Sequence, residues 1–199
     1  MRMRKSSSFR WVCALALMGG LLSAGSWRVA AAEPTAFQLA KEGNRYVGEP
    51  SRDKVLEIYS DKSLVGLTPS IWYVDYFDPD AKGKIVEVKF GAGLKLEVKR
   101  PLKLFGGGGK ESNILDLARL KVDSSEVIRI AKSQELLRPL TLNNAQLWLK
   151  RGDDGVAWKV RLWAAKLSDA KATVEIGDIF ISPEDGRVVR ADLHVERAR

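Results

Sequence analysis

Short runs of alternating apolar and polar residues, separated by turn-forming residues, are the feature that most constrains the fold of this 199-residue chain. β-Branched and aromatic residues at every second position are typical of strands that bury one face. Turn sequences such as RGDDG (151–155) and PEDG (183–186) join consecutive runs, and connections this short allow only antiparallel pairing. The sequence therefore predicts antiparallel sheet, with strands at 70–77, 84–90, 94–100, 145–150, 157–163, 171–182 and 187–196.

Two segments with a different period precede these runs. In DSSEVIRIAKS (123–133), Val127, Ile128 and Ile130 form an apolar stripe at helical spacing, and Asp123 with Glu126 predicts a capping box. SRDKVLEIYSD (51–61) carries a similar pattern, which predicts a helix capped by Ser51. Residues 33–48 are expected to be a lightly ordered lead-in, because glycine, asparagine and proline interrupt them.

Helix followed by strands thus occurs twice, which predicts an α+β fold of two tandem modules. Each module is expected to pack one helix on a three- to four-stranded antiparallel sheet. The predicted modules are 33–104 and 113–199, joined by a glycine-rich linker at 105–112 (FGGGGKES). The glycine run is not a Walker loop, since Glu111 stands where serine or threonine is required and Leu104 where the first glycine is required.

The first 32 residues have the pattern of a secretory signal peptide. Four basic residues precede an apolar run of 12 residues (11–22), and Ala30, Ala31 and Ala32 precede Glu33. The apolar run is shorter than the roughly 20 residues that a membrane-spanning helix needs, although an uncleaved anchor is the alternative. We expect Sec-type export to the periplasm or outside the cell, cleavage near Ala32–Glu33, and no stable membrane span afterwards.

Removal of this segment changes two arguments. Cys13, the only cysteine, would be lost, so residues 33–199 can form no disulfide, thiol nucleophile or cysteine metal site. The net charge of +8 falls to +3, because five basic and no acidic residues lie in the first 32. A charge this small gives little support for nucleic-acid binding, and we expect none.

The second half resembles a known family. SSEVIRIAK, the Leu140–Thr141 pair, AWKVRLW and IFISPEDGRVVRADL are similar to a PepSY domain over about 123–196. The first half matches only in its helix-and-sheet pattern, and a cystatin-type module would give much the same pattern. The resemblance implies a small exported module that packs a helix on an antiparallel sheet, has no catalytic residues, and binds proteins, in some cases peptidases.

Residues that would indicate catalysis or metal binding are few. His194, the only histidine, is expected on the solvent face of its strand beside Asp192 and Glu196, with Val189, Ala191, Leu193 and Val195 on the opposite face. Asp75, Asp78 and Asp80 do not fit a calcium-binding EF-hand loop, because lysine stands at two of its ligand positions. We therefore predict no enzyme activity, no metal site and no cofactor.

The candidate binding residues combine bases with an aromatic ring. In AWKVRLW, Trp158, Val160 and Leu162 share one face, so Lys159, Arg161 and Trp163 share the other. Trp163 is either a surface anchor for a partner or is buried between two sheets. In LKLEVKR (94–100), Lys95 and Lys99 are predicted to face solvent, with Leu94, Leu96 and Val98 inward.

These observations favour an exported cell-envelope module that acts through protein–protein contact. The partner is expected to be an envelope or secreted protein, with a peptidase as one candidate and inhibition as one outcome. The alternative is a periplasmic carrier of a small ligand or lipid, with the ligand enclosed by helix and sheet.

Overall fold

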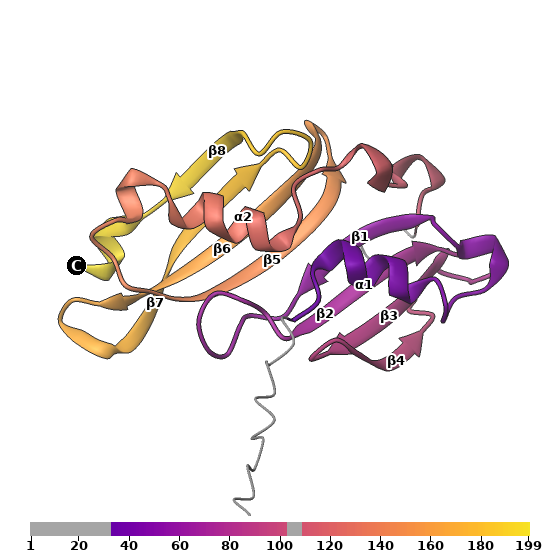
Figure 1. Cartoon of the computed structure of the whole chain (residues 1–199), viewed down its shortest axis with the longest axis horizontal. Helices are drawn as coiled ribbons and strands as arrows, with labels where there is room; N and C mark the ends of the chain where they lie inside the picture. Colours follow the sequence, from indigo (N-terminus) through magenta and orange to yellow (C-terminus); the bar gives the residue numbers. More distant parts are fainter. Residues whose placement is uncertain (1–32, 103–108) are drawn as a thin grey trace, which may run out of the picture. The chain divides into compact units, whose positions relative to one another are not determined.

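The computed structural model describes residues 33–102 and 109–199, which belong to one compact unit (Figure 1). The predicted signal peptide and half of the predicted glycine-rich linker, residues 105–108, lie outside the described residues. Within these two ranges, no helix has the length and apolarity needed to cross a membrane.

One helix followed by four strands occurs twice along the chain. The first half contains α1 (Ala36–Gly43), β1 (Val55–Ser60), β2 (Ile71–Phe77), β3 (Ile85–Gly91) and β4 (Leu94–Lys99). The second contains α2 (Ser124–Lys132), β5 (Leu142–Gly152), β6 (Gly155–Lys166), β7 (Asp169–Ile181) and β8 (Val188–Leu193). Single 3₁₀ turns lie at Glu49–Ser51, Glu111–Asn113, Leu117–Arg119, Glu135–Leu137 and Val195–Ala198.

All eight strands form one antiparallel sheet, in the order β4-β3-β2-β1-β5-β6-β7-β8. The α+β class and the antiparallel pairing are confirmed. The prediction of two separate sheets is wrong, because β1 and β5 pair directly, with Ile58 opposite Leu149 and Tyr59 opposite Trp148. Strand β1 thus lies between two hydrogen-bonded neighbours, which joins the halves through their backbones.

The helix predicted at 51–61 is wrong, since Val55–Ser60 forms strand β1. Apolar residues this closely spaced suit either a short helix or a buried strand, and pairing with both β2 and β5 decides for the strand. The helix of the first half is α1, within the segment expected to be lightly ordered. Its buried residues recur at helical spacing, namely Ala36, Leu39, Ala40 and Gly43.

The helix predicted at the start of the second half is confirmed as α2, with Asp123 at its N-cap. Glu126 does not complete the predicted capping box and instead accepts a hydrogen bond from Arg129 Nε at 2.8 Å. Asp123 and Ser124 also bind the start of α1. Phe37 N donates to Asp123 Oδ1 at 3.1 Å, and Ala36 N donates to Ser124 Oγ at 3.0 Å. Asp123 Oδ1 also accepts from Ser124 N, so these two residues satisfy N–H groups at the start of both helices, which have no partner within the helix.

The main core lies between the sheet and the helices, which both cover the same face of the sheet (Figure 1). Trp158 is fully buried there. Its Nε1 donates to Val122 O at 2.8 Å, and its ring stacks on Phe37 with centroids 6.1 Å apart. The side chain of Trp158 therefore connects β6 to α1 and to the segment that leads into α2.

Candidate functional site

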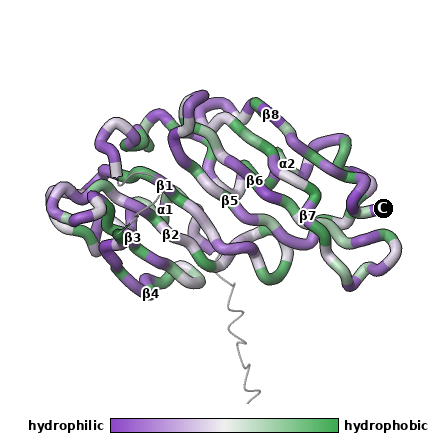
Figure 2. The backbone as a smooth tube through the Cα atoms, turned by 180° about the vertical axis from the view of Figure 1, so that it is seen from behind, coloured by the Kyte–Doolittle hydropathy of each residue, from purple (hydrophilic) through white to green (hydrophobic). Residues whose placement is uncertain are grey.

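The face of the sheet opposite α1 and α2 carries the candidate site, and we call it the open face. Side chains alternate between the two faces of a strand, so the buried residues of β5 and β6 put the residues between them on the open face. Figure 2 views the sheet from behind, and in the part of the chain that the structure describes neither α-helix lies on this side.

One line of paired residues crosses the open face from strand to strand. Tyr59 of β1 is opposite both Tyr73 and Trp148, so the line continues without interruption across the junction of the two halves. Bases and aromatic rings make up most of it. We call this line the central row; from β4 to β8 it consists of Glu97, Lys89, Tyr73, Tyr59, Trp148, Lys159, Phe180 and Arg190.

Ring stacking and hydrogen bonding hold the first half of the central row in place. The rings of Tyr59 and Tyr73 stack with centroids 4.8 Å apart, and Lys89 Nζ lies 5.1 Å from the Tyr73 centroid. Tyr59 donates its hydroxyl hydrogen to Glu87 Oε2 at 2.6 Å. Burial and this hydrogen bond raise the pKa of Tyr59 far above its ordinary value, so the phenol stays protonated.

Trp148 begins the second half of the central row, and two cations lie near its ring. Lys159 Nζ is 5.2 Å and the Arg161 guanidinium carbon 5.6 Å from its ring centroid. Further along the row, the Arg190 guanidinium carbon lies 4.0 Å from the centroid of Phe180. Cations at these distances from aromatic rings are attracted to the ring faces.

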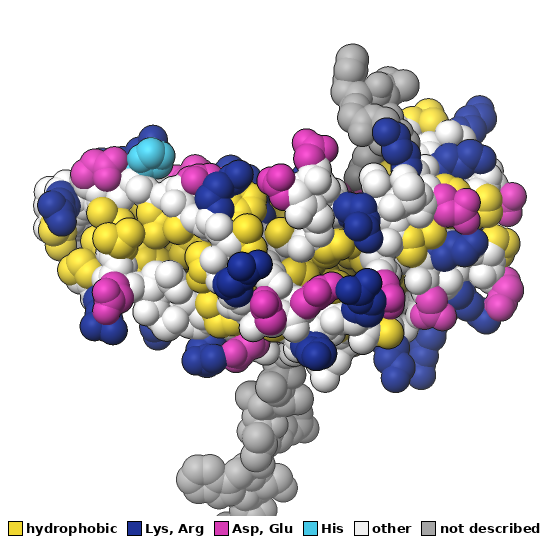
Figure 3. All heavy atoms as spheres, turned by 90° about the horizontal axis from the view of Figure 1, so that it is seen from above, with side chains coloured by type: hydrophobic (Ala, Val, Ile, Leu, Met, Phe, Trp, Pro, Cys, Tyr) yellow, Lys and Arg dark blue, Asp and Glu magenta, His cyan; other side chains and the backbone are white. Residues whose placement is uncertain are grey.

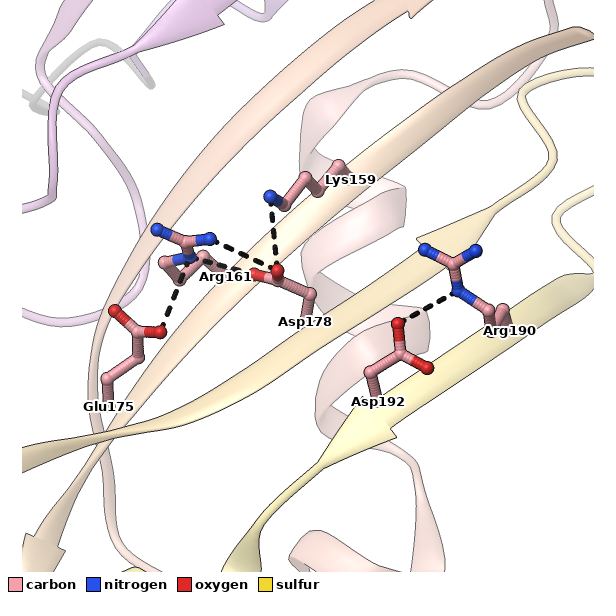
Figure 4. A network of polar contacts seen from close by, with 6 residues as sticks. All are labelled: Lys159, Arg161, Glu175, Asp178, Arg190 and Asp192. Carbon is pink, nitrogen blue, oxygen red and sulfur yellow. Dashed lines mark hydrogen bonds and ion pairs between the residues drawn. The ribbon is translucent and has the colours of Figure 1, made fainter. Parts of the chain in front are cut away.

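Carboxylates hold these cations in place (Figure 4). Asp178 accepts hydrogen bonds from Arg161 at 2.8 and 3.2 Å and forms an ion pair with Lys159 at 3.1 Å. Glu175 lies 3.7 Å from the same guanidinium, and Arg190 is paired with Asp192 at 2.9 Å.

A β-bulge allows two carboxylates to reach one arginine. Glu175 and Asp178 are three positions apart, so a regular strand would place them on opposite faces. In β7 the pairing shifts between Leu162 and Trp163 of the neighbouring strand, which leaves Ile176 as an extra residue. Gly177 follows it with φ of +114°, and a Cβ there would lie 2.0 Å from Asp192 O. Only glycine fits this bulge.

Replacing Asp178 with asparagine is expected to lower the free energy of unfolding by about 2 kcal/mol at neutral pH, because Arg161 and Lys159 lose their shared counter-charge. Burial would raise the pKa of Asp178, but hydrogen bonds and charges from Arg161 and Lys159 outweigh it and hold the pKa below 3.8.

The ionised carboxylate therefore stabilises the fold above the unfolded-state pKa, and this contribution is lost as the pH falls through the lower, folded-state pKa. Urea unfolding of both proteins from pH 7 down to pH ~2 should show a constant difference that shrinks below pH ~4. Asp192→Asn, at an exposed pair, should cost much less. A difference for Asp178→Asn that is independent of pH would contradict this account.

The structure places Lys159, Arg161 and Trp163 together on the open face, opposite the buried Trp158, Val160 and Leu162. Trp163 is half-buried, and Lys62 Nζ lies 4.4 Å from its ring centroid. Trp163 is not buried between two sheets, because the two halves of the chain share one sheet.

Lys95 and Lys99 are both exposed, as predicted, but they do not share a face of the sheet. A bulge in β4 pairs Glu97 with Lys89 but Lys95 with Phe90, which points to the helix side. Lys95 Nζ accordingly lies 5.6 Å from the centroid of the Tyr46 ring. Lys99 lies opposite Glu87 in the neighbouring strand, on the open face. The inward placement of Leu94, Leu96 and Val98 is also wrong, because all three are exposed on this edge strand.

Strand β8 differs from its prediction for a similar reason. A register shift opposite Phe180 and Ile181 turns Val188 inward and leaves Val189 exposed. His194 follows the strand, is exposed (Figure 3) and lies 3.5 Å from Glu196. Asp78, considered above as a calcium ligand, instead accepts hydrogen bonds from Asp80 N and Arg100 Nε.

Sequence reasoning did not single out Tyr59, Tyr73, Trp148 and Phe180. Each is the aromatic residue between buried neighbours of its strand, a signal present in the sequence. Their alignment across five strands depends on register, which alternation alone does not supply.

Comparisons of this chain with known protein families, with curated proteins and with solved structures find no match.

Proposed function

We propose that this chain is an exported cell-envelope module that binds another protein through its open face. The central row is the observation that carries this proposal. Its aromatic rings and the guanidinium of Arg190 are side chains of the kinds enriched at the centres of protein interfaces, where tryptophan, tyrosine and arginine dominate the binding energy.

The side chains of the open face are already held in place by one another, which supports the same proposal. The rings of Tyr59 and Tyr73 are stacked on each other, and Lys159 and Arg161 are held by Asp178. Side chains already held in one arrangement lose little conformational entropy when a partner binds. Because most cations on this face have a nearby carboxylate, we expect a partner with mixed charge rather than nucleic acid.

The signal-peptide pattern supports export, and the similarity of 123–196 to PepSY domains supports a protein partner, for which a peptidase is one candidate. The repeated order of one helix and four strands supports two PepSY- or cystatin-like modules fused through β1 and β5. We propose no catalytic activity and no cofactor.

The test is affinity capture from an envelope extract of the source cells, with residues 33–199 immobilised. A protein retained by this chain should bind at least about 30-fold more weakly to Trp148→Ala, since an interface tryptophan of this kind contributes about 2 kcal/mol or more. Trp163→Ala should weaken the same complex. The affinity of the purified pair would be measured by surface plasmon resonance.

Tyr46→Ala is the matched control. Tyr46 is also a partly exposed ring beside a lysine, Lys95, but it lies on the helix side of the sheet. This variant should bind like the wild type, and all three should remain folded at the temperature of the binding measurement. Equal binding by Trp148→Ala and the wild type would refute the proposed site.

A small-ligand or lipid carrier is the second candidate, and a cavity of about 570 Å³ favours it. The cavity lies beside α2 and has an apolar wall with two bases; the lining includes Leu67, Ile128, Leu140, Leu142, Lys132 and Arg138. Native mass spectrometry of the purified chain would reveal a retained ligand, and a spectrum of the bare chain alone would disfavour this candidate.

A further inference from the structure

The four most exposed large hydrophobic side chains of the described ranges lie at one end of the sheet. In an antiparallel meander, successive turns alternate between two ends of the strands. The β1–β2 loop, the β3–β4 turn and the β6–β7 turn share one of these, which we call the loop end. Leu64 (84% exposed) and Val65 (90%) lie in the loop, Leu94 (71%) follows the β3–β4 turn, and Leu167 (70%) is in the β6–β7 turn.

The β1–β2 loop is built so that Leu64 and Val65 project outward. Ser63 on one side donates its N–H to Ala145 O at 2.8 Å and its hydroxyl to Gly66 O at 2.6 Å. Asn144 Nδ2 donates to Ser63 O at 2.8 Å, and Gly66 with φ of +66° forms a bridge to Asn144. The two apolar residues are therefore held between anchored neighbours, and Figure 1 shows this loop, in purple, projecting from the same end of the sheet as the β6–β7 turn.

Basic residues flank these apolar side chains. Lys62 precedes Leu64 by two positions and Lys166 precedes Leu167. The same turns also hold two carboxylates: Asp61 accepts a hydrogen bond from the Tyr73 hydroxyl at 3.2 Å, and Asp169 accepts one from Lys171 N at 3.0 Å. Aliphatic side chains beside lysines suit the boundary between lipid headgroups and acyl chains.

The N-terminal part of the chain joins the described residues at the same end. Pro34 packs against Gly93 of the β3–β4 turn, and Glu33 lines a small cavity with Thr68 and Trp72. Leu22, the last residue of the apolar run, precedes Glu33 by eleven positions, which span at most about 36 Å when extended. Until a signal segment is removed, insertion of this run into a bilayer would keep the loop end close to the lipid.

We infer that the loop end is a membrane-contact surface. Leu64 and Val65 insert among the lipid headgroups of a bilayer, Leu94 and Leu167 widen the apolar contact, and Lys62 and Lys166 meet lipid phosphates. A lipid surface fits better than a second protein, because these side chains are aliphatic and are spread over three separate turns, whereas protein hot spots are aromatic and clustered. This inference does not depend on the function proposed for the open face.

Vesicle flotation tests the inference with residues 33–199, which contain every described element of the compact unit. The chain should float with phospholipid vesicles that contain phosphatidylglycerol, and less with pure phosphatidylcholine vesicles. Leu64→Ser combined with Val65→Ser should reduce the partition coefficient on the order of tenfold, since two aliphatic side chains no longer leave water.

Leu102→Ser is the matched control, because Leu102 is also exposed (62%) but follows β4 at the opposite end of the sheet. It should float like the wild type. A dye attached to Val65→Cys should shift its emission to the blue on addition of vesicles, and a dye on Leu102→Cys should not. No other cysteine competes for the dye in residues 33–199.

Three results would overturn the inference. The wild type fails to float with either kind of vesicle, or the double variant floats as well as the wild type, or the dye at Val65 shows no shift while the chain floats. A double variant that instead changes the oligomeric state without affecting flotation would assign these residues to a contact between copies of the chain.

Discussion

Replacing Trp158 with alanine is expected to lower the free energy of unfolding by about 4 kcal/mol, the range measured for loss of a buried large aromatic side chain. Trp158 is fully buried and contacts Phe37, so the substitution leaves a cavity between β6 and α1. It also leaves Val122 O without its donor at 2.8 Å. Total stabilities are typically about 5–15 kcal/mol, so the variant should unfold at much lower urea concentration.

Two substitutions separate the causes of this loss. Trp158→Phe keeps most of the ring but removes the hydrogen bond to Val122 O, and should cost about 1–3 kcal/mol. Trp163→Ala removes the same kind of side chain from the half-buried open face and should cost clearly less than Trp158→Ala. If both tryptophans cost the same, the assignment of Trp158 to the core and Trp163 to the open face is wrong.

Gly177→Ala is the second substitution expected to have a large effect. A methyl group there would lie 2.0 Å from Asp192 O, and the φ of +114° is strained for any residue with a Cβ. We expect a loss of about 3–5 kcal/mol, the sum of backbone strain and overpacking. Because the bulge at Gly177 brings Glu175 and Asp178 to Arg161, the variant should also weaken partner binding at the open face.

Gly155→Ala is the matched control for this substitution. Gly155 has a similar φ of +107°, but nothing lies within 4 Å of an added Cβ. It should therefore show the strain alone, about 1–3 kcal/mol, and leave binding unchanged. Urea unfolding of both variants measures the difference, and equal losses would show that the contact with Asp192 O is relieved by small backbone shifts.

Much of the fold could be predicted from local patterns. Alternation in β2, β3, β6 and β7 and the capped apolar stripe of α2 identify these elements, because side-chain period and end-capping are local properties. The short apolar cluster of Val55–Ser60 fits both the helical period and the strand period, so the sequence alone predicts a helix there. The segment forms a strand because it then pairs with both β2 and β5. Helix α1 was missed although Ala36, Leu39, Ala40 and Gly43 have helical spacing.

The open-face site was predictable only in part. The alternation of Trp158, Val160 and Leu162 places Lys159, Arg161 and Trp163 on one side, whatever strand lies next to them. The bulges opposite Lys89 and Leu162 move Lys95 away from Lys99 and bring Glu175 and Asp178 together. Such bulges depend on how two strands pair, which no single run of residues specifies.

By itself, the sequence determined the α+β class, the antiparallel arrangement of β2 to β4 and of β5 to β8, helix α2 and the face on which Lys159, Arg161 and Trp163 lie, because short-range periods and turns encode all of these. Only the tertiary structure decided that β1 pairs with β5 and joins the halves in one sheet. The central row and the apolar loop end both follow from that sheet, since strand register and the arrangement of turns are set by contacts between residues far apart in the chain.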